Sequence, residues 1–144
     1  GATLLDDYKL SRAAGFGAET RRRIILGTYV LSHGYYDAYY RKAALLRAAL
    51  TREFDTIFEN VSYIATPTAP GPAFKIGEKL DPLSLYIEDI FTVSANLAGV
   101  PALSAPFGTV VRDGVQLPVG IQFMAQKRGE QALFAVARDT MGEV

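Results

Sequence analysis

Residues 35–60 contain neither Pro nor Gly and carry apolar side chains at helical spacing. These apolar positions form one stripe along the predicted helix: Tyr36, Tyr39, Ala43, Leu46, Leu50, Phe54 and Ile57. Residues 61–66 follow directly and are rich in β-favouring side chains, until Pro67 ends the run. A long amphipathic helix followed at once by a strand indicates a fold in which helices cover a sheet.

The composition is that of one globular domain spanning residues 1–144. Fifteen Lys and Arg balance fifteen Asp and Glu, 49% of the residues are hydrophobic and 21% are charged. The charge balance argues against nucleic acid or an anionic membrane as a direct partner of this chain. No apolar run approaches the ~20 residues that cross a bilayer. The leading Gly1 without Met suggests a cut start, so we expect the chain to be part of something longer.

The other predicted elements alternate between helices and short strands. Thr3 with Asp6 predicts a helix start, and the helix is expected to run to about Arg12, before Gly15-Phe16-Gly17. A second helix from about Ala18 is expected to bury at least one face. Further helices are expected over residues 85–98, in two pieces, and 129–141. Strands are expected over residues 102–107 and 119–125, joined by a turn around Arg112-Asp113-Gly114. In the last helix, Ala132, Leu133, Val136 and Ala137 are predicted to point inward.

These elements predict an α/β layer arrangement with a narrow sheet. In the strand over residues 119–125, Phe123 and Ala125 share one face, and Gln122 and Met124 share the other. Three apolar strands make a small sheet, so we interpret them as part of a larger one whose other strands lie outside this chain. Residues 67–84 are expected to form a long Pro- and Gly-bearing loop of the functional or neighbour-wrapping kind.

No nucleotide-binding or nucleophile motif is present. The sequence has no G-x-x-x-x-G-K-[ST] segment and no G-x-S-x-G elbow. Without Cys there is no thiolate nucleophile or thiolate metal site, and a single histidine, His33, argues against a His-based metal site or a Ser-His-Asp triad. The five clustered tyrosines of residues 29–40 are expected to pack at a core edge rather than to stack bases.

Two sets of charged residues are candidates for ligand binding. Arg21-Arg22-Arg23 begins a helix, where neighbours are about 100° apart and cannot share one environment. A solvated basic face is the simplest interpretation of all three. Alternatively, one guanidinium turns inward to hold a carboxylate, and Arg23 is the candidate because it precedes Ile24-Ile25.

Asp89 lies among apolar neighbours in the segment Tyr86-Ile87-Glu88-Asp89-Ile90-Phe91. A carboxylate on such a face must be paired or cap a helix, unless it binds a ligand. The residues alone leave these alternatives open.

The order of several segments resembles a known family. These segments are Arg22-Arg23-Ile24, Gly34-Tyr35-Tyr36-Asp37-Ala38-Tyr39-Tyr40, Pro67-Thr68-Ala69-Pro70, Asp89-Ile90-Phe91-Thr92, Asn96-Leu97-Ala98-Gly99-Val100-Pro101 and Pro118-Val119-Gly120-Ile121-Gln122. From about Asp7 onward the chain resembles the C-terminal part of the A subunits of aspartyl/glutamyl-tRNA(Asn/Gln) amidotransferases, within the amidase signature family. The resemblance implies a C-terminal fragment of an amidase signature domain, with a mixed sheet flanked by helices and truncated here.

The resemblance also implies an activity. Such a subunit hydrolyses glutamine and supplies ammonia for the amidation of glutamyl-tRNA(Gln) or aspartyl-tRNA(Asn). The family's Ser-Ser-Lys triad lies in the N-terminal half, with the serines in a Gly/Ser-rich segment that this chain lacks. No catalytic residue is therefore assigned, and the chain alone is expected to be inactive. In the glutaminase members, the residues at Arg23 and Asp89 hold the substrate α-carboxylate and α-ammonium.

The implied partners follow from the same resemblance. They are glutamine, the B and C subunits, and aminoacyl-tRNA through the complex, with ATP and Mg²⁺ at the B subunit, no cofactor or metal in this chain, and no membrane. The expected location is the bacterial cytoplasm or an organelle. Two alternatives remain open: the C-terminal half of a plain amidase signature hydrolase, in which Arg23 and Asp89 are incidental, and a non-catalytic protein-interaction domain.

Overall fold

The computed structural model describes residues 2–32, 35–78 and 81–142. Two compact units make up the chain, Gly1–Leu46 and Arg47–Val144, and each is described by itself. The single domain expected for residues 1–144 stays a prediction. His33 lies outside the described residues.

The first unit is helical. Helix α1 (Leu4–Gly15) begins as predicted, because the Thr3 hydroxyl accepts the backbone N–H of Asp6 at 3.2 Å and the Asp6 carboxylate accepts that of Thr3 at 3.1 Å. Helix α2 (Ala18–Val30) contains no buried residue, and Ile25 is 70% exposed. The expectation that α2 buries a face is therefore wrong for this chain. The apolar spacing is present, but within the first unit no surface covers it.

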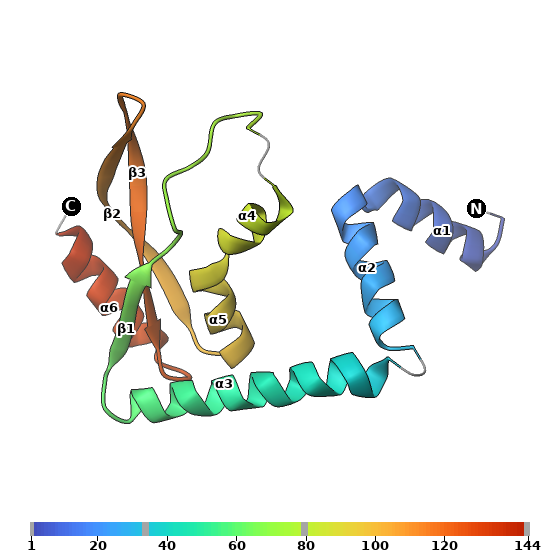
Figure 1. Cartoon of the computed structure of the whole chain (residues 1–144), viewed down its shortest axis with the longest axis horizontal. Helices are drawn as coiled ribbons and strands as arrows, with labels where there is room; N and C mark the ends of the chain where they lie inside the picture. Colours follow the sequence, from blue (N-terminus) through green and yellow to red (C-terminus); the bar gives the residue numbers. More distant parts are fainter. Residues whose placement is uncertain (1, 33–34, 79–80, 143–144) are drawn as a thin grey trace. The chain divides into compact units, whose positions relative to one another are not determined.

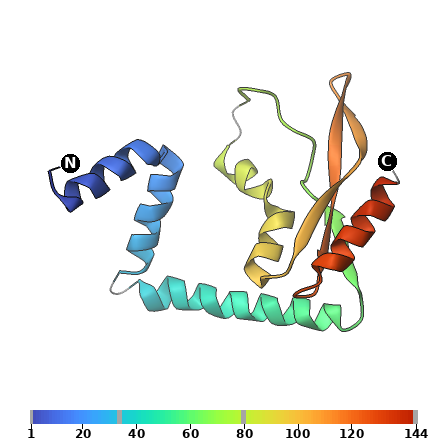
Figure 2. The same cartoon turned by 180° about the vertical axis from the view of Figure 1, so that it is seen from behind.

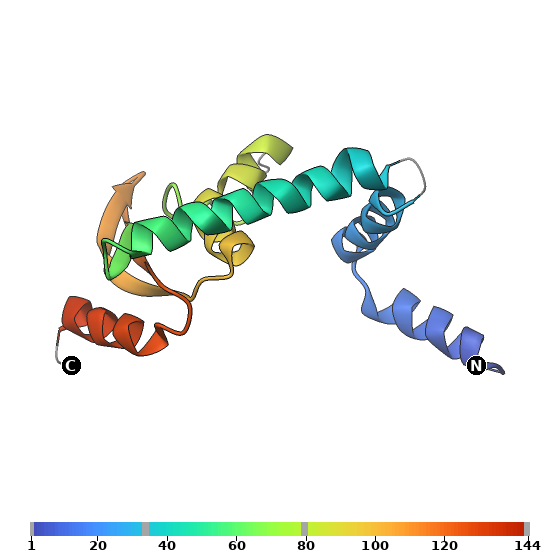
Figure 3. The same ribbon diagram turned by 90° about the horizontal axis from the view of Figure 1, so that it is seen from below.

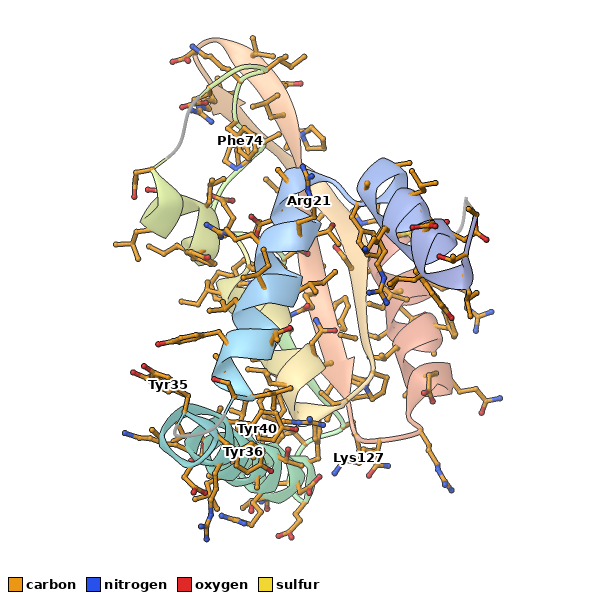
Figure 4. All side chains as sticks on the ribbon, turned by 90° about the vertical axis from the view of Figure 1, so that its right-hand side faces the viewer. Arg21, Tyr35, Tyr36, Tyr40, Phe74 and Lys127 are labelled. Carbon is orange, nitrogen blue, oxygen red and sulfur yellow. The ribbon has the colours of Figure 1, made fainter. Side chains whose placement is uncertain are left out.

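The predicted helix over residues 35–60 changes geometry along its length. It begins as a π-helical segment, η1 (Tyr36–Arg41), and continues as α3 (Lys42–Phe58). Tyr36 and Tyr40 of η1 (Figure 4) stack on each other with ring centroids 5.0 Å apart. The ring centroids of Tyr35 and Tyr29 are 4.4 Å apart. These rings are partly exposed and contact one another rather than a core edge. Of the predicted apolar stripe Phe54 is the one fully buried residue, and Leu50 packs half-buried against the same core cluster.

The second unit contains the sheet. Strand β1 (Tyr63–Pro67) is followed by helices α4 (Pro82–Ile87) and α5 (Ile90–Ala98), then by β2 (Ala102–Arg112) and β3 (Val115–Ala125), and by helix α6 (Glu130–Met141) (Figure 1). The strand order is β1-β3-β2, and both pairings are antiparallel. The turn predicted near Asp113-Gly114 is confirmed, and both residues have positive φ.

The two faces of β3 separate two cores, as the alternation predicted. Met124 faces a cluster with Phe54 of α3 and with Ala95 and Ala98 of α5. Phe123 faces the other cluster, which contains Ala105, Ala125, Leu133 and Ala137. Helices α5 and α6 thus cover opposite faces of the sheet (Figure 3), which confirms the α/β fold class. Ala132, predicted to point inward, is exposed because Leu133 and Ala137 carry the contact of α6.

The long loop after β1 runs beside the β2–β3 hairpin and returns to α4 (Figure 2). Arg112 of β2 donates to the Ala73 carbonyl at 3.3 Å and to both carboxylate oxygens of Glu78 at 3.2 Å. Lys75 pairs with Asp113 at 2.7 Å. The loop and the hairpin line a groove of about 920 Å³. The loop ends before the predicted Ser84, because Asp81 caps α4.

The ion pair between Glu78 of the loop and Arg112 of β2 is expected to weaken in acid. The backbone N–H of Lys75, at 2.8 Å, and then Arg112 hold the pKa of Glu78 below its ordinary value of 4.5. A carboxyl group with a lowered folded-state pKa stabilises the fold above its unfolded pKa and loses that contribution as the pH falls through the lowered value. We therefore expect Glu78→Gln to lower the melting temperature at pH 7, and the difference from wild type to shrink as the pH falls from 7 to below 4.5. Thermal unfolding of both proteins across this range is the measurement, and a pH-independent difference would contradict the assignment.

Among the described residues, no helix combines the length and apolar character needed to span a bilayer.

Candidate functional site

Asp89 lies between α4 and α5 and is the N-cap residue of α5. Its side chain is exposed and makes no capping hydrogen bond. Its backbone carbonyl accepts from the N–H groups of Thr92 at 3.1 Å and Val93 at 2.9 Å. Within the described part of the chain, the carboxylate forms neither a hydrogen bond nor an ion pair. The structure therefore shows neither of the two structural roles that the sequence left open for it, a cap and an ion pair.

Asp81, the N-cap residue of the neighbouring helix α4, bonds to its helix through its side chain. Its carboxylate accepts the backbone N–H of Leu83 at 3.0 Å and of Ser84 at 3.2 Å, and also the Ser84 hydroxyl. The Ser84 hydroxyl and backbone bonds lower the pKa of Asp81. Sequence reasoning did not single out this cap, although Asp followed by Pro and then by Ser at the third position is a helix-start signal. Asp89 is likewise an N-cap residue, but its side chain makes no capping hydrogen bond to α5.

Helix α5 has Asp89 at its start, and one buried amide of the sheet bonds to its first turn. Gln122 of β3 is 3% exposed, and its Nε2 donates to the Phe91 carbonyl at 2.9 Å and to the Thr66 hydroxyl at 3.2 Å. At the other end of α5, Arg47 Nε donates to the Leu97 carbonyl at 3.1 Å. The sequence placed Gln122 on its correct face of β3 but gave no sign of these long-range bonds.

A small polar pocket of about 280 Å³ adjoins α5 and the sheet. Its hydrogen-bonding lining residues are Thr68, Thr92, Asn96, Ser104 and Gln122. The Thr68 and Ser104 hydroxyls bond to each other at 2.7 Å directly above Gly120. A Cβ at Gly120 would lie 2.7 Å from Ser104 Oγ and 2.9 Å from Thr68 Oγ1, so this hydroxyl pair requires glycine there.

Arg23 lies on α2, which belongs to the first unit, whereas Asp89 belongs to the second. The Nε of Arg23 donates to Glu19 at 3.0 Å, and its side chain is 73% exposed rather than turned inward. Arg22 shares the same carboxylate at 3.0 Å. The hydrogen bond from Arg23 is the main cause that lowers the pKa of Glu19. The exposed Arg21 (Figure 4) fits the solvated interpretation.

The serines of the described residues that form hydrogen bonds do so with nearby caps, backbone carbonyls or hydroxyl groups. Ser84 bonds to Asp81, Ser94 to the Phe91 carbonyl and Ser104 to Thr68, and no serine in the described part of the chain bonds to a lysine. Lys127, at the turn between β3 and α6 (Figure 4), pairs with Asp55 at 3.0 Å. Nor do the described residues contain a group of His, Asp and Glu side chains that could hold a metal ion.

Comparisons with known proteins give consistent matches. The sequence model of the Amidase family matches residues 2–134. The A subunit of glutamyl-tRNA(Gln) amidotransferase from Geobacillus kaustophilus is 54% identical over 135 residues, which are 93% of this chain and 27% of that protein. The protein of the same name from Thermodesulfovibrio yellowstonii is 51% identical over 95% of this chain and 28% of its own length.

A solved structure matches as well. The crystal structure of the glutamyl-tRNA(Gln) amidotransferase A subunit from Thermotoga maritima gives a TM-score of 0.66 at 45% identity and covers 91% of this chain and 28% of that one. The chain thus spans little more than a quarter of the length of the proteins that it matches.

Proposed function

Because this chain belongs to the amidase family, we propose that it is the substrate-recognising C-terminal part of a glutamine-hydrolysing A subunit of a tRNA-dependent amidotransferase. The observation that carries the proposal is the 54% identity, over 93% of the chain, to a protein named as the A subunit of glutamyl-tRNA(Gln) amidotransferase. The carboxylate of Asp89 supports it, because a side chain with no bonding partner among the described residues is available to a ligand.

The proposed task of the chain is to recognise free glutamine by its two backbone charges. Glutamine is a zwitterion, and Arg23 would hold the α-carboxylate through the two-pronged fork of its guanidinium. Asp89 would hold the α-ammonium. A ligand that lacks either charge leaves one member of the pair uncompensated, which costs binding free energy and provides selectivity.

The ion pair between Arg23 and Glu19 is compatible with this role. It leaves the Nη atoms of Arg23 available, since only Nε donates to Glu19 in the structure. Glu19 would then orient the guanidinium while the two terminal nitrogens meet the carboxylate, as planar bidentate recognition requires.

The bond-breaking step would come from the rest of the parent protein. We place the Ser-Ser-Lys triad there, so this chain alone is expected not to hydrolyse glutamine. In the same proposal, a B subunit receives the ammonia and holds ATP and Mg²⁺ for amidation of glutamyl-tRNA(Gln) or aspartyl-tRNA(Asn), and a C subunit joins the other two. This assembly would act in the cytoplasm of a bacterium.

The Arg23 part of the proposal predicts a specific loss in the full-length subunit complex. Arg23→Lys keeps the charge but removes the planar fork, so we expect kcat/KM for glutamine to fall by about tenfold or more, mainly through KM. Arg21→Lys is the matched control, because it lies on the same helix and does not bond to Glu19. Steady-state glutaminase kinetics measure the effect, and equal values for the two variants would remove Arg23 from the site.

A further inference from the structure

One buried side chain of the sheet, that of Gln122, bonds to the first turn of α5. Asp89, whose carboxylate has no partner among the described residues, lies at the start of that turn. We propose that Gln122 is a positioning residue for Asp89: by holding the Phe91 carbonyl, it fixes where the Asp89 carboxylate stands. This inference rests on the proposed function, because it assumes that Asp89 meets the α-ammonium of glutamine.

The first step is the orientation of the Gln122 amide. A backbone carbonyl can only accept a hydrogen bond, so the group 2.9 Å from the Phe91 oxygen must be the NH₂ of Gln122. The second N–H of the same group reaches the Thr66 hydroxyl at 3.2 Å. Gln122 thereby connects three segments: β1, β3 and the first turn of α5. Burial to 3% exposure keeps water from replacing either bond.

The second step is that Asp89 has no side-chain anchor of its own. Its carboxylate forms no bond within the described residues, so its position follows from the backbone of the first turn. That turn is held internally, because the Asp89 carbonyl accepts from Thr92 and Val93. A movement of the Phe91 carbonyl therefore carries Asp89 with it.

The third step is that this turn has no fully buried side chain of its own. Ile90 and Val93 are exposed and Phe91 and Thr92 are half-buried, whereas the fully buried residues of α5, Ala95 and Ala98, lie further along. The bond from Gln122 is the one hydrogen bond by which a described side chain of the sheet holds the first turn. Arg47 holds the last turn instead, through the Leu97 carbonyl. Loss of Gln122 therefore loosens the Asp89 end of α5, whereas loss of Arg47 loosens the opposite end.

The consequence is a defect in selectivity rather than a general loss of activity. A small displacement of a charged contact group weakens recognition of the charge that it meets. An amide substrate without the α-ammonium does not use that contact. Glutaramate, which is glutamine without its α-amino group, is a suitable second substrate because it keeps the α-carboxyl end and the amide.

The test uses the full-length subunit complex and measures kcat and KM for glutamine and for glutaramate. Gln122→Met keeps the length of the side chain and removes both N–H donors. We expect it to lower the ratio of kcat/KM for glutamine to that for glutaramate by about tenfold, mostly through KM for glutamine. Arg47→Met is the matched control, since it removes a bond to the other end of the same helix, and it should leave the ratio unchanged. Thr66→Val, a milder and isosteric change, should lower the ratio in the same direction by a smaller factor.

A second series separates this inference from the proposed function. Asp89→Asn alone should lower the ratio, and adding Gln122→Met to Asp89→Asn should lower it little further, because the group being positioned has lost its charge. If Asp89→Asn leaves the ratio unchanged, the proposed function fails and the inference falls with it. If Asp89→Asn lowers the ratio while Gln122→Met and Thr66→Val behave like Arg47→Met, the inference alone is overturned.

Discussion

Replacing Asp89 by Asn in the full-length subunit complex is expected to lower kcat/KM for glutamine on the order of a hundredfold. The change keeps the shape of the side chain and removes its charge, so the substrate α-ammonium enters the site without a counter-ion. The use of glutaramate, which has no ammonium, is expected to fall much less. The diagnostic quantity is the ratio of the two activities, measured by steady-state kinetics with the fold checked by circular dichroism.

Asp81→Asn provides the matched control for this experiment. Asp81 is also an N-cap aspartate in the second unit, but its carboxylate is bonded to Leu83 and Ser84. Its replacement removes the same charge from a neighbouring helix start, and Asn is itself a good N-cap. We expect the ratio to stay at the wild-type value. If Asp89→Asn lowers the activity on both substrates by the same factor, Asp89 has a structural role and does not recognise the α-ammonium. That result would favour the two alternative functions, a plain amidase hydrolase and an interaction domain.

The largest effect on stability is expected at Phe54. It is 9% exposed and packs with Ala95, Ala98 and Met124 in the core between α3, α5 and β3. Phe54→Ala removes a buried ring and leaves a cavity, which costs about 3–5 kcal/mol of the free energy of unfolding. Urea denaturation of the 144-residue chain, followed by circular dichroism, measures this loss.

Leu46→Ala is the control, because Leu46 belongs to the same predicted apolar stripe but is 64% exposed. Its replacement is expected to change the free energy of unfolding by about 0.5 kcal/mol or less. Similar losses at the two positions would mean that the stripe is buried along its whole length in solution, and would contradict the distribution of burial in the structure.

These two positions also show what the sequence could and could not predict about the fold. Features whose cause lies within a few residues were predicted correctly: the Thr3–Asp6 cap, the turn at Asp113-Gly114 and the end of α5 at Gly99, which has a φ of 70°. Periodicity also assigned the faces of β3 correctly. It could not say which part of a stripe has a partner. One face of α2 at least, and the stripe along η1 and α3, were expected to be buried, but α2 and most of that stripe are exposed.

The candidate site was only partly accessible from the sequence. Asp89 stood out as a charge among apolar neighbours, yet only the structure could say whether it is paired, and there its carboxylate bonds to none of the described side chains or backbone groups. The amide of Gln122 bonds to residues 56 and 31 positions away in the chain, and no local pattern encodes such a contact. The roles of Arg23 and Asp89 rest on the resemblance, and they stay predictions until the kinetic experiments are done.

The strand order has a consequence for how the second unit acquires its structure. Of the three described strands, β3 comes last along the chain yet is central in the sheet, and Tyr63 of β1 pairs with Ala125 at the far end of β3. The β2–β3 hairpin closes over a tight turn, whereas β1 must find its partner across a long intervening loop and two helices. Closing long loops costs more chain entropy and slows folding. We therefore expect the hairpin to form first, and the pairing of β1 with β3 to wait until synthesis has passed Ala125.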